Sequence, residues 1–367
     1  MRPIFRPPHG VFHSLAQRRH HLAAALCGLL LLAAYGRSTE PPAPALAAPV
    51  ALPNTVLPAS HYRLTLPGSS ARVSSPSLAA LPDGRLAAVW LGEGHGQHQV
   101  DQAIWFSTLQ QQNWHEPYAL VTRETAAGHT LAHLSDIARP LLLAHADRLD
   151  LWFNAHGPGQ QMHPAIHVMT SYDAGHSWST PRRLAVSSWL QGGHLEGARP
   201  AQALADGGSL LALAERPDAA RFFWLRLNAA GQVIARSDAD GSLAAERMLA
   251  ARPLPTLGPH ALLPLGGDQL LLAGSSDPQR SELGLWLAAA QDTQDTQDTQ
   301  GTRGSAWQSV RRVASTPPTP DAPQPLADPV LQMTGDGRIH LLYVWRGHAL
   351  HHLAFTPAWL ASAGEAP

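Results

Sequence analysis

Cysteine is almost absent from the sequence: Cys27 is the single example in 367 residues. It lies in an apolar run near the N-terminus, and the residue before it, Leu26, is not the small residue that a lipoprotein attachment site carries. Beyond this run the chain has no cysteine, so it has neither a disulfide framework nor thiol chemistry. A disulfide-stabilised scaffold and a cysteine-dependent enzyme are therefore excluded.

Charge is also scarce. Charged residues make up 14% of the chain, and 26 basic residues against 27 acidic ones give a formal net charge of −1. Because nucleic-acid-binding proteins usually show a basic excess or stripe, this balance argues against a nucleic-acid partner. The 21 histidines far outnumber the difference between acidic and basic residues, so mild acid would make the chain strongly positive.

The apolar run at residues 22–34 is too short for an ordinary membrane span. It follows the basic segment 18–21, and this order is typical of an export signal. Residues 45–47, Ala-Leu-Ala, offer a small-x-small cleavage site, and cleavage nearer Gly36 is the alternative. We therefore expect a periplasmic or secreted protein without a stable membrane span after cleavage. An uncleaved N-terminal anchor is the competing interpretation.

The 30 Gly and 32 Pro residues interrupt the sequence too often for long helices. The chain contains instead a module that recurs along its length. Each copy begins at a proline, continues through an apolar strand, turns at Asp-Gly or a substitute, and enters a second strand. The copies begin at Pro76, Pro140, Pro200, Pro259 and Pro329. A single module cannot bury both of its faces, so the modules are expected to stack around a common axis. This arrangement predicts an all-β fold, namely a β-propeller of four-stranded blades.

The blade count depends on one further copy. Five copies are visible, and a sixth is either hidden between Arg236 and Arg252 or completed by the segment 61–67. We therefore predict six blades, with five as the alternative. The predicted domains are a signal peptide with a Pro/Ala-rich linker (1–47), the propeller (48–362) with a low-complexity insertion (291–306), and a tail (363–367). We interpret the insertion as a tolerated loop rather than a binding loop.

One octet carries more information than the modules. Residues 171–178 have the form Ser-x-Asp-x-Gly-x-x-Trp, set by Ser171, Asp173, Gly175 and Trp178. Asp and Gly suit a tight turn in which the carboxylate binds local amides, and the Trp is expected to pack between blades. A degraded copy with the same spacing has Ser107, Leu109, Gln111 and Trp114 in the four positions.

The octet resembles the Asp-box of the sialidase (neuraminidase) superfamily, whose members carry BNR/Asp-box repeats. The stretches 75–107 and 336–360 are also similar to the opening and closing blades of such proteins. The resemblance implies a sialidase-like propeller that contacts a glycan or glycoconjugate. It also implies that the box is structural and lies on the face opposite the active site, so Asp173 is not expected to be catalytic.

The resemblance further implies three arginines that clamp the sugar carboxylate, an aspartate acid/base and a tyrosine nucleophile. Asp101 falls at the acid/base position, and Arg199 and Arg280 fall at two of the arginine positions. Ser74 replaces the remaining arginine, for which Arg72 is a substitute, and Asp328 replaces the tyrosine. The arginines also have an ordinary structural interpretation as blade-capping or ion-pair residues.

Two functions follow. If Asp328 faces the channel, it serves as a carboxylate nucleophile opposite Asp101 in an exo-acting glycoside hydrolase, and a neutral sugar suits it better than sialic acid. Otherwise the chain is a catalytically degenerate propeller that binds a carbohydrate or a protein. We expect no cofactor and no metal site; the histidines of the predicted loop face are interpreted as solvated residues, namely His95, His98, His163, His167 and His194.

Overall fold

The computed structural model describes residues 25–29, 44–47, 57–94, 102–158, 164–184, 194–195, 200–214, 222–238, 254–265, 269–289 and 307–362. The chain divides into two units, Met1–Ala43 and Pro44–Pro367. Residues 25–29 of the first unit are helical. In the described part of the chain, every helix falls short of the length and apolar character that a membrane crossing requires.

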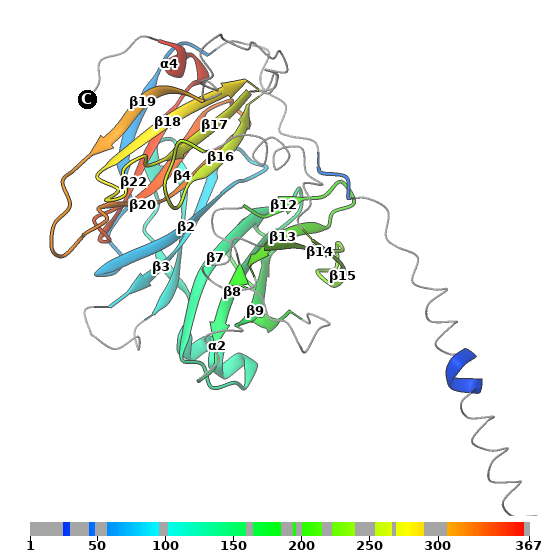
Figure 1. The fold of residues 1–367 in the computed structure, drawn as a ribbon. Helices are drawn as coiled ribbons and strands as arrows, with labels where there is room; N and C mark the ends of the chain where they lie inside the picture. Colours follow the sequence, from blue (N-terminus) through cyan, green and yellow to red (C-terminus); the bar gives the residue numbers. More distant parts are fainter. Residues whose placement is uncertain are drawn as a thin grey trace, which may run out of the picture. The chain divides into compact units, whose positions relative to one another are not determined.

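The second unit is a β-propeller of five antiparallel sheets, which we call blades 1 to 5 in chain order (Figure 1). Blade 1 consists of β2 (Arg72–Ala80), β3 (Leu86–Glu93), β4 (Ala103–Gln110) and β5 (Asn113–Trp114), with β6 (Tyr118–Thr122) also paired to β4. Blade 2 consists of β7 (Asp136–Ala144), β8 (Leu149–His156), β9 (Ala165–Ser171) and β10 (Arg182–Arg183).

Blades 3 and 4 follow the same plan. Blade 3 consists of β11 (His194–Leu195), β13 (Ser209–Ala214), β14 (Phe222–Leu227) and β15 (Val233–Asp238), with β12 (Gln202–Ala203) also paired to β13. Blade 4 consists of β16 (Ala261–Leu265), β17 (Gln269–Gly274), β18 (Glu282–Ala289) and β19 (Gln308–Ser315). Two short helices, α2 (Arg123–Thr130) and α4 (Pro357–Ala361), follow β6 and β22.

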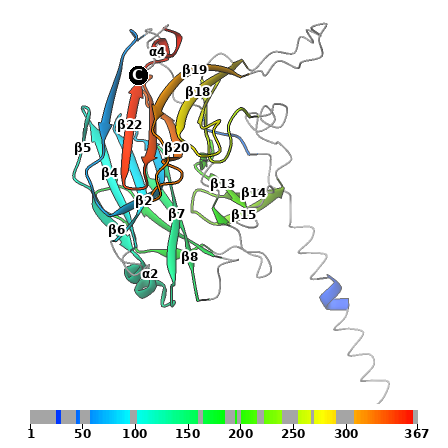
Figure 2. The same cartoon turned by 60° about the vertical axis from the view of Figure 1, so that its left-hand side comes forward.

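Blade 5 joins the two ends of the propeller. Its strands β20 (Leu326–Met333), β21 (Ile339–Trp345) and β22 (Ala349–Phe355) come from the C-terminal part, and β1 (His61–Thr65) is added at the outer edge. In this pairing Arg63 lies opposite Leu353. Figure 2 shows β22 and β20 of this blade, and β21 lies between them in the sheet. The predicted six-blade count is therefore wrong, because the N-terminal segment completes the fifth blade instead of forming a sixth.

The predicted hairpins are present, and their glycines explain the turns. Gly84, Gly207 and Gly337 have φ of 84°, 77° and 80°, a region that favours glycine. In the first turn, the amide of Arg85 donates to the Asp83 carboxylate over 3.0 Å. Strands that emerge from these turns are buried on both faces: every residue of β13, which follows Gly207, is buried. Packing on both faces between neighbouring blades accounts for these apolar sequences.

A bulge recurs in the innermost strands. Ser75, Arg139 and Asp328 each precede a proline and have φ of 50°, 51° and 47°. At each site the pairing shifts, so that this residue and its proline together lie opposite one residue of the next strand. Proline cannot donate to the sheet ladder, which explains why the ladder is interrupted here. The bulge places the residue before proline in an equivalent position in blades 1, 2 and 5.

Residues 45–47 also belong to the propeller unit. The amide of Ala47 donates to the carbonyl of Ala203 over 2.8 Å, and the amide of Ala205 donates to the carbonyl of Ala45 over 2.9 Å. Leu46 forms an isolated antiparallel bridge with Leu204. This short segment therefore adds a backbone pairing next to β12 of blade 3.

Candidate functional site

The octet forms the turn that its residues predict. Ser171 Oγ donates to Asp173 over 2.8 Å and accepts the amide of Gly175 over 2.9 Å. The hydroxyl and the amide of Ser177 both donate to the Asp173 carboxylate, and these bonds lower its pKa to about 2. Gly175 has φ of 94°. The polar groups of Ser171, Asp173 and Ser177 are thus engaged in shaping the turn, as a structural role requires.

Trp178 joins blade 2 to blade 1, as predicted. Its ring meets Phe106 edge-on at 5.6 Å between centroids, and its Nε1 donates to the carbonyl of Gly175 over 3.2 Å. Tyr118 of blade 1 donates its hydroxyl to the same carbonyl over 2.6 Å. The box therefore fixes the angle between the first two blades, and its contribution is to packing rather than to chemistry.

The strand registers identify the opposite face of the propeller. In blade 2, Leu149 pairs with Ser171 at the end of the sheet that carries the box, and Ala155 pairs with Ala165 at the other end. At this other end, Asp136 pairs with His156, so the innermost strand β7 begins there. We call this side, where the innermost strands begin, the mouth face. Chemistry separate from the box is expected on it.

A titratable cluster lies on the mouth face of blade 2. His156 Nδ1 is hydrogen-bonded to the carboxylate of Asp136, and both side chains are mostly buried, with 11% and 16% exposure. The ring of His194, from β11 of blade 3, lies 5.7 Å from the ring of His156. The carbonyl of His156 accepts the amide of Ser135 over 2.7 Å, which fixes the end of β8. Asp136 therefore orients the imidazole, and Nε2 makes no hydrogen bond within the described residues.

Asp328 is held by the neighbouring blade. Its Oδ2 accepts the amide of Ser75 over 3.0 Å, so the bulges of blades 5 and 1 are joined directly. Its Oδ1 makes no hydrogen bond within the described residues, and the side chain is half-buried. The amide of Leu142 donates to Ser77 Oγ over 3.0 Å, so β2 is also joined to β7. The predicted nucleophile thus lies on an innermost strand, with one oxygen oriented and one open.

Arg139 is the equivalent residue of blade 2. Its Nη1 donates to the carbonyl of Leu195 over 3.2 Å, which joins it to β11 of blade 3, and the side chain is half-buried. Three residues of this face, Arg139, Asp136 and His156, were not predicted from the sequence. A signal for Arg139 was available, since it precedes Pro140 as Asp328 precedes Pro329 and Arg199 precedes Pro200.

Two buried amide side chains, those of Asn154 and Gln102, lie just beneath the mouth face. The Asn154 side chain is fully buried, and its Oδ1 accepts the amide of Leu195 over 3.2 Å. Gln102 accepts the amide of Ile137 over 3.1 Å and donates to Glu93 over 3.3 Å. Each amide side chain therefore bridges two blades just beneath the mouth, which keeps the starts of the innermost strands in register.

Two of the predicted arginines, Arg72 and Arg280, lie within the described residues. Arg72 is exposed at the start of β2. Arg280 lies in the turn between β17 and β18, where its guanidinium covers Gly258 so closely that a Cβ there would come 2.8 Å from Nη2. Asp101 and Arg199 lie outside the described residues, as do His95, His98 and His163. Convergence of three arginines on one mouth therefore stays a prediction.

The two other predicted loop histidines are buried, which corrects their interpretation as solvated residues. His167 lies in β9 against the ring of Phe153 at 5.5 Å, and burial lowers its pKa. His194 is 3% exposed. Within the described residues, no group of three or more His, Cys, Asp or Glu is arranged to hold a metal ion.

Comparison with known proteins agrees with this architecture. Residues 84–246 match the family described as BNR repeat-like domain. The leech intramolecular trans-sialidase, complexed with 2,7-anhydro-Neu5Ac, is 11% identical and superimposes with a TM-score of 0.50 over 79% of this chain and 69% of that chain. No curated protein matches in sequence.

Two further structures are similar. The Trypanosoma rangeli sialidase in complex with sialic acid is 9% identical, with a TM-score of 0.47 over 83% of this chain and 60% of that chain. An exo-1,5-α-L-arabinanase from a bovine ruminal metagenomic library is 11% identical, with a TM-score of 0.45 over 79% of this chain and 94% of that chain. The leech enzyme establishes the fold, and the matched segment 84–246 carries the repeat. The second unit therefore has a sialidase-like propeller fold, and its segment 84–246 matches the BNR repeat-like domain.

Proposed function

We propose that this propeller is an exported, exo-acting glycoside hydrolase that removes a terminal sugar from a glycoconjugate at the mouth face. The observation that carries the proposal is the carboxylate of Asp328. Its Oδ2 is fixed by the amide of Ser75, while Oδ1 has no hydrogen bond within the described residues. A carboxylate that is oriented through one oxygen and open at the other suits nucleophilic attack.

The substrate class follows from the charge of this nucleophile. Sialidases use a neutral tyrosine, because a carboxylate would repel the carboxylate of sialic acid. Asp328 stands at the tyrosine position and Ser74 at one arginine position. Both replacements disfavour an anionic sugar. A neutral terminal sugar is the substrate that this set of residues fits best.

The proton donor is assigned to His156. Asp136 binds its Nδ1, as the orienting group of a catalytic triad does, and Nε2 has no hydrogen bond within the described residues. In the first step the C1 carbon of the sugar bonds to the Asp328 carboxylate while its bond to the leaving oxygen breaks, and that oxygen takes the proton from Nε2 of the doubly protonated His156. Water then attacks C1 and gives a proton to Nε2, which breaks the bond to Asp328 and releases the sugar. Asp101 is the second candidate for the proton donor.

Fluorogenic glycosides test this proposal. The purified chain is incubated with a panel of neutral 4-methylumbelliferyl glycosides and the corresponding sialoside. We expect turnover of a neutral member and no turnover of the sialoside. Asp328→Asn should lower kcat at least ~100-fold, whereas Asp83→Asn, in a turn on the box face, should leave kcat unchanged. Absence of turnover across the panel overturns the enzymatic proposal.

A second candidate function is glycan binding without turnover. It is favoured by the absence of the tyrosine and of one arginine at the positions that the resemblance implies, where Asp328 and Ser74 stand. In that case the same panel of sugars binds but is not hydrolysed. Loss of binding in Arg139→Ala, measured by calorimetry, supports this function.

Export is part of the proposal, and the pairing of residues 45–47 supports a cleavage point upstream of them. Since Ala45 and Ala47 bond to blade 3, cleavage after Ala47 would remove a paired segment. We therefore favour cleavage upstream, nearer Gly36. N-terminal sequencing of the periplasmic or secreted product should give a start before Ala45. A start at residue 48 contradicts this placement.

A further inference from the structure

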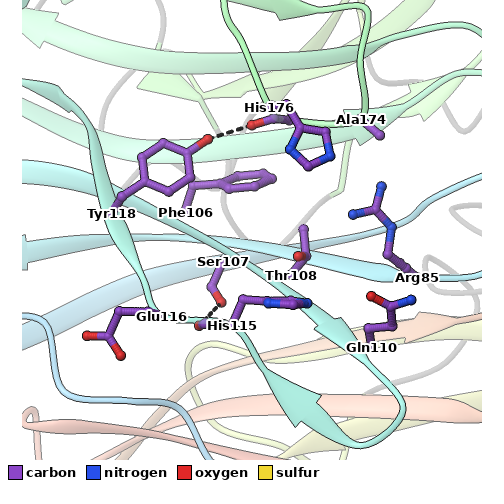
Figure 3. A pocket seen from close by; sticks show the side chains of 11 residues that line it. Arg85, Phe106, Ser107, Thr108, Gln110, His115, Glu116, Tyr118, Ala174 and His176 are labelled. Carbon is purple, nitrogen blue, oxygen red and sulfur yellow. Dashed lines mark hydrogen bonds between the residues drawn. The ribbon is translucent and has the colours of Figure 1, made fainter.

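A groove opens on the box face between blades 1 and 2, on the side of the propeller away from the mouth. Its volume is about 450 Å³, which falls within the range of small-molecule sites. It is lined from blade 1 by Arg85, Phe106, Gln110, His115 and Tyr118, and from blade 2 by His176 (Figure 3). No part of the mouth-face chemistry contributes to it.

The unequal turns of the two blades flank this groove. In blade 1, Gln111 and Gln112, with φ of 50° and 64°, form a two-residue turn between β4 and β5. In blade 2 the complete Asp-box, residues 171–178, occupies the corresponding turn. The turn between the paired strands is therefore shorter in blade 1, although the degraded box has the same spacing, and the groove lies between the two boxes. The loss of the Asp and Gly in blade 1 thus has a structural consequence besides weaker turn chemistry.

The floor of the groove is aromatic and rigid. Phe106 is 3% exposed, and the Tyr118 ring lies 5.5 Å from it at an angle of 54°. Tyr118 is 41% exposed, although its hydroxyl is fixed to the carbonyl of Gly175. An aromatic ring that is anchored by its polar end and open on its side offers apolar surface at little cost in conformational entropy.

The rim of the groove consists of polar side chains that are available for hydrogen bonds to a ligand. Side chains of Gln110, His115, Glu116 and His176 are exposed and make no hydrogen bond within the described residues. Amide, imidazole and carboxylate groups together supply both donors and acceptors. In Figure 3 the rings of His115 and His176 lie on opposite sides of the space beside Phe106. This combination is suited to a ligand with many hydroxyl groups.

Charge selects the class of saccharide. Arg85 is the one permanent cation of the lining, and its guanidinium is already paired with Asp83 at 2.7 Å. Glu116 is an exposed carboxylate on the same rim. Because the cation is neutralised and a carboxylate remains, an anionic ligand has no free partner at neutral pH. A polar, uncharged ligand is favoured.

We propose that this groove is a second saccharide site, which binds a neutral oligosaccharide on the face opposite the mouth. The inference goes beyond the proposed hydrolase function, since it needs no catalysis. If the groove binds sugars of a glycan-rich surface, the propeller stays attached to that surface whether or not the mouth face is occupied.

Calorimetry with neutral oligosaccharides of two to six units tests this inference, with sialyllactose as the anionic comparison. We expect binding of a neutral member and at least ~10-fold weaker binding in Gln110→Ala and in His176→Ala, as the loss of a hydrogen-bonding group implies. Both side chains are exposed, so the fold should be retained. Tyr172→Ala removes an exposed aromatic ring of the same loop that does not line the groove, and it should leave the affinity unchanged.

The mouth and the groove are distinguished by Asp328→Asn, which should abolish turnover and preserve the groove affinity. The inference is overturned if no neutral oligosaccharide binds, if Gln110→Ala and His176→Ala bind as the wild type does, or if all binding is lost in Arg139→Ala. The last result would assign the binding to the mouth alone. None of these outcomes depends on whether the chain hydrolyses glycosides.

Discussion

His340 Nδ1 and His352 Nε2 are joined by a hydrogen bond of 2.9 Å inside blade 5, with nearly parallel rings. Trp114 of blade 1 donates to His352 Nδ1 over 3.3 Å. Since the indole can only donate, His352 must carry its proton on Nε2 and donate it to His340. His340 Nε2 then donates to Thr334 Oγ1, whose hydroxyl bonds to Asp336. The chain of bonds requires both imidazoles to be neutral.

Acid should therefore weaken the closure between blades 5 and 1. Burial lowers the pKa of His340 to about 4, and burial with the nearby His340 lowers that of His352 to about 3. Arg338, Asp336 and Tyr62 are the other charged or titratable groups nearby. Because the unfolded chain takes up protons below about pH 6.5 and the folded chain does not, each histidine costs about 1.4 kcal/mol per pH unit down to its native pKa.

The measurement is the free energy of unfolding in urea at pH 7, 6 and 5, for the wild type and His352→Gln. Glutamine can accept from Trp114 and donate to His340 without titrating, so the variant should lose less stability as the pH falls. The difference should be about 0.7 kcal/mol between pH 7 and 6 and should approach about 1.4 kcal/mol per pH unit below that. Identical slopes would mean that this histidine does not sense acid.

Gly175→Ala should destabilise the propeller. A Cβ at this position would lie 2.3 Å from the Phe106 ring, and φ is 94°. Left-handed backbone costs roughly 1–2 kcal/mol for a residue with a side chain, and overpacking adds about 1–3 kcal/mol. Gly84→Ala, with φ of 84° and open space around it, should show the backbone cost alone. Equal losses of stability in the two variants, measured in urea, would contradict the packing role of the box.

Asn154→Leu should also be destabilising, by about 1–3 kcal/mol, because the buried amide of Leu195 loses its acceptor. Asn113→Leu changes an exposed residue of β5 and serves as the matched control. Chemical denaturation of both variants checks the prediction. A stability of Asn154→Leu equal to that of the control would show that the bridge between blades 2 and 3 is not needed.

Arg139→Lys keeps the charge at the mouth and changes the geometry of the donors. We expect a higher KM for the neutral glycoside with little change in stability, since the side chain is half-buried and, among the described residues, makes one hydrogen bond, to Leu195. Steady-state kinetics beside thermal unfolding separates the two effects. An unchanged KM would remove Arg139 from the site.

The sequence was informative where the signals are local. The hairpin turns at Gly84 and Gly337 and the whole box from Ser171 to Trp178 follow from short patterns with defined backbone chemistry. The number of blades does not, because β1 and β22 come from opposite ends of the chain and pair across the whole fold. A short strand carries no signal that identifies a partner so distant.

In the candidate site, too, local sequence patterns were informative and contacts between distant segments were not. Asp328 was predictable because it stands before a proline of the repeat, whereas its bond to Ser75 joins two blades. The pairing of Asp136 with His156 depends on the exact register of β7 and β8, which a bulge shifts. Repeat position could have indicated Arg139, but the register had to come from the structure.

Trapping the covalent intermediate tests the central claim most directly. The chain is incubated with a 2-deoxy-2-fluoro derivative of the neutral glycoside that it turns over, and the intact protein and its peptides are weighed. The account predicts one added sugar per chain, attached to the peptide that contains Asp328 and absent from Asp328→Asn. A sugar attached to another residue, or no adduct on a chain that still hydrolyses the glycoside, would contradict it.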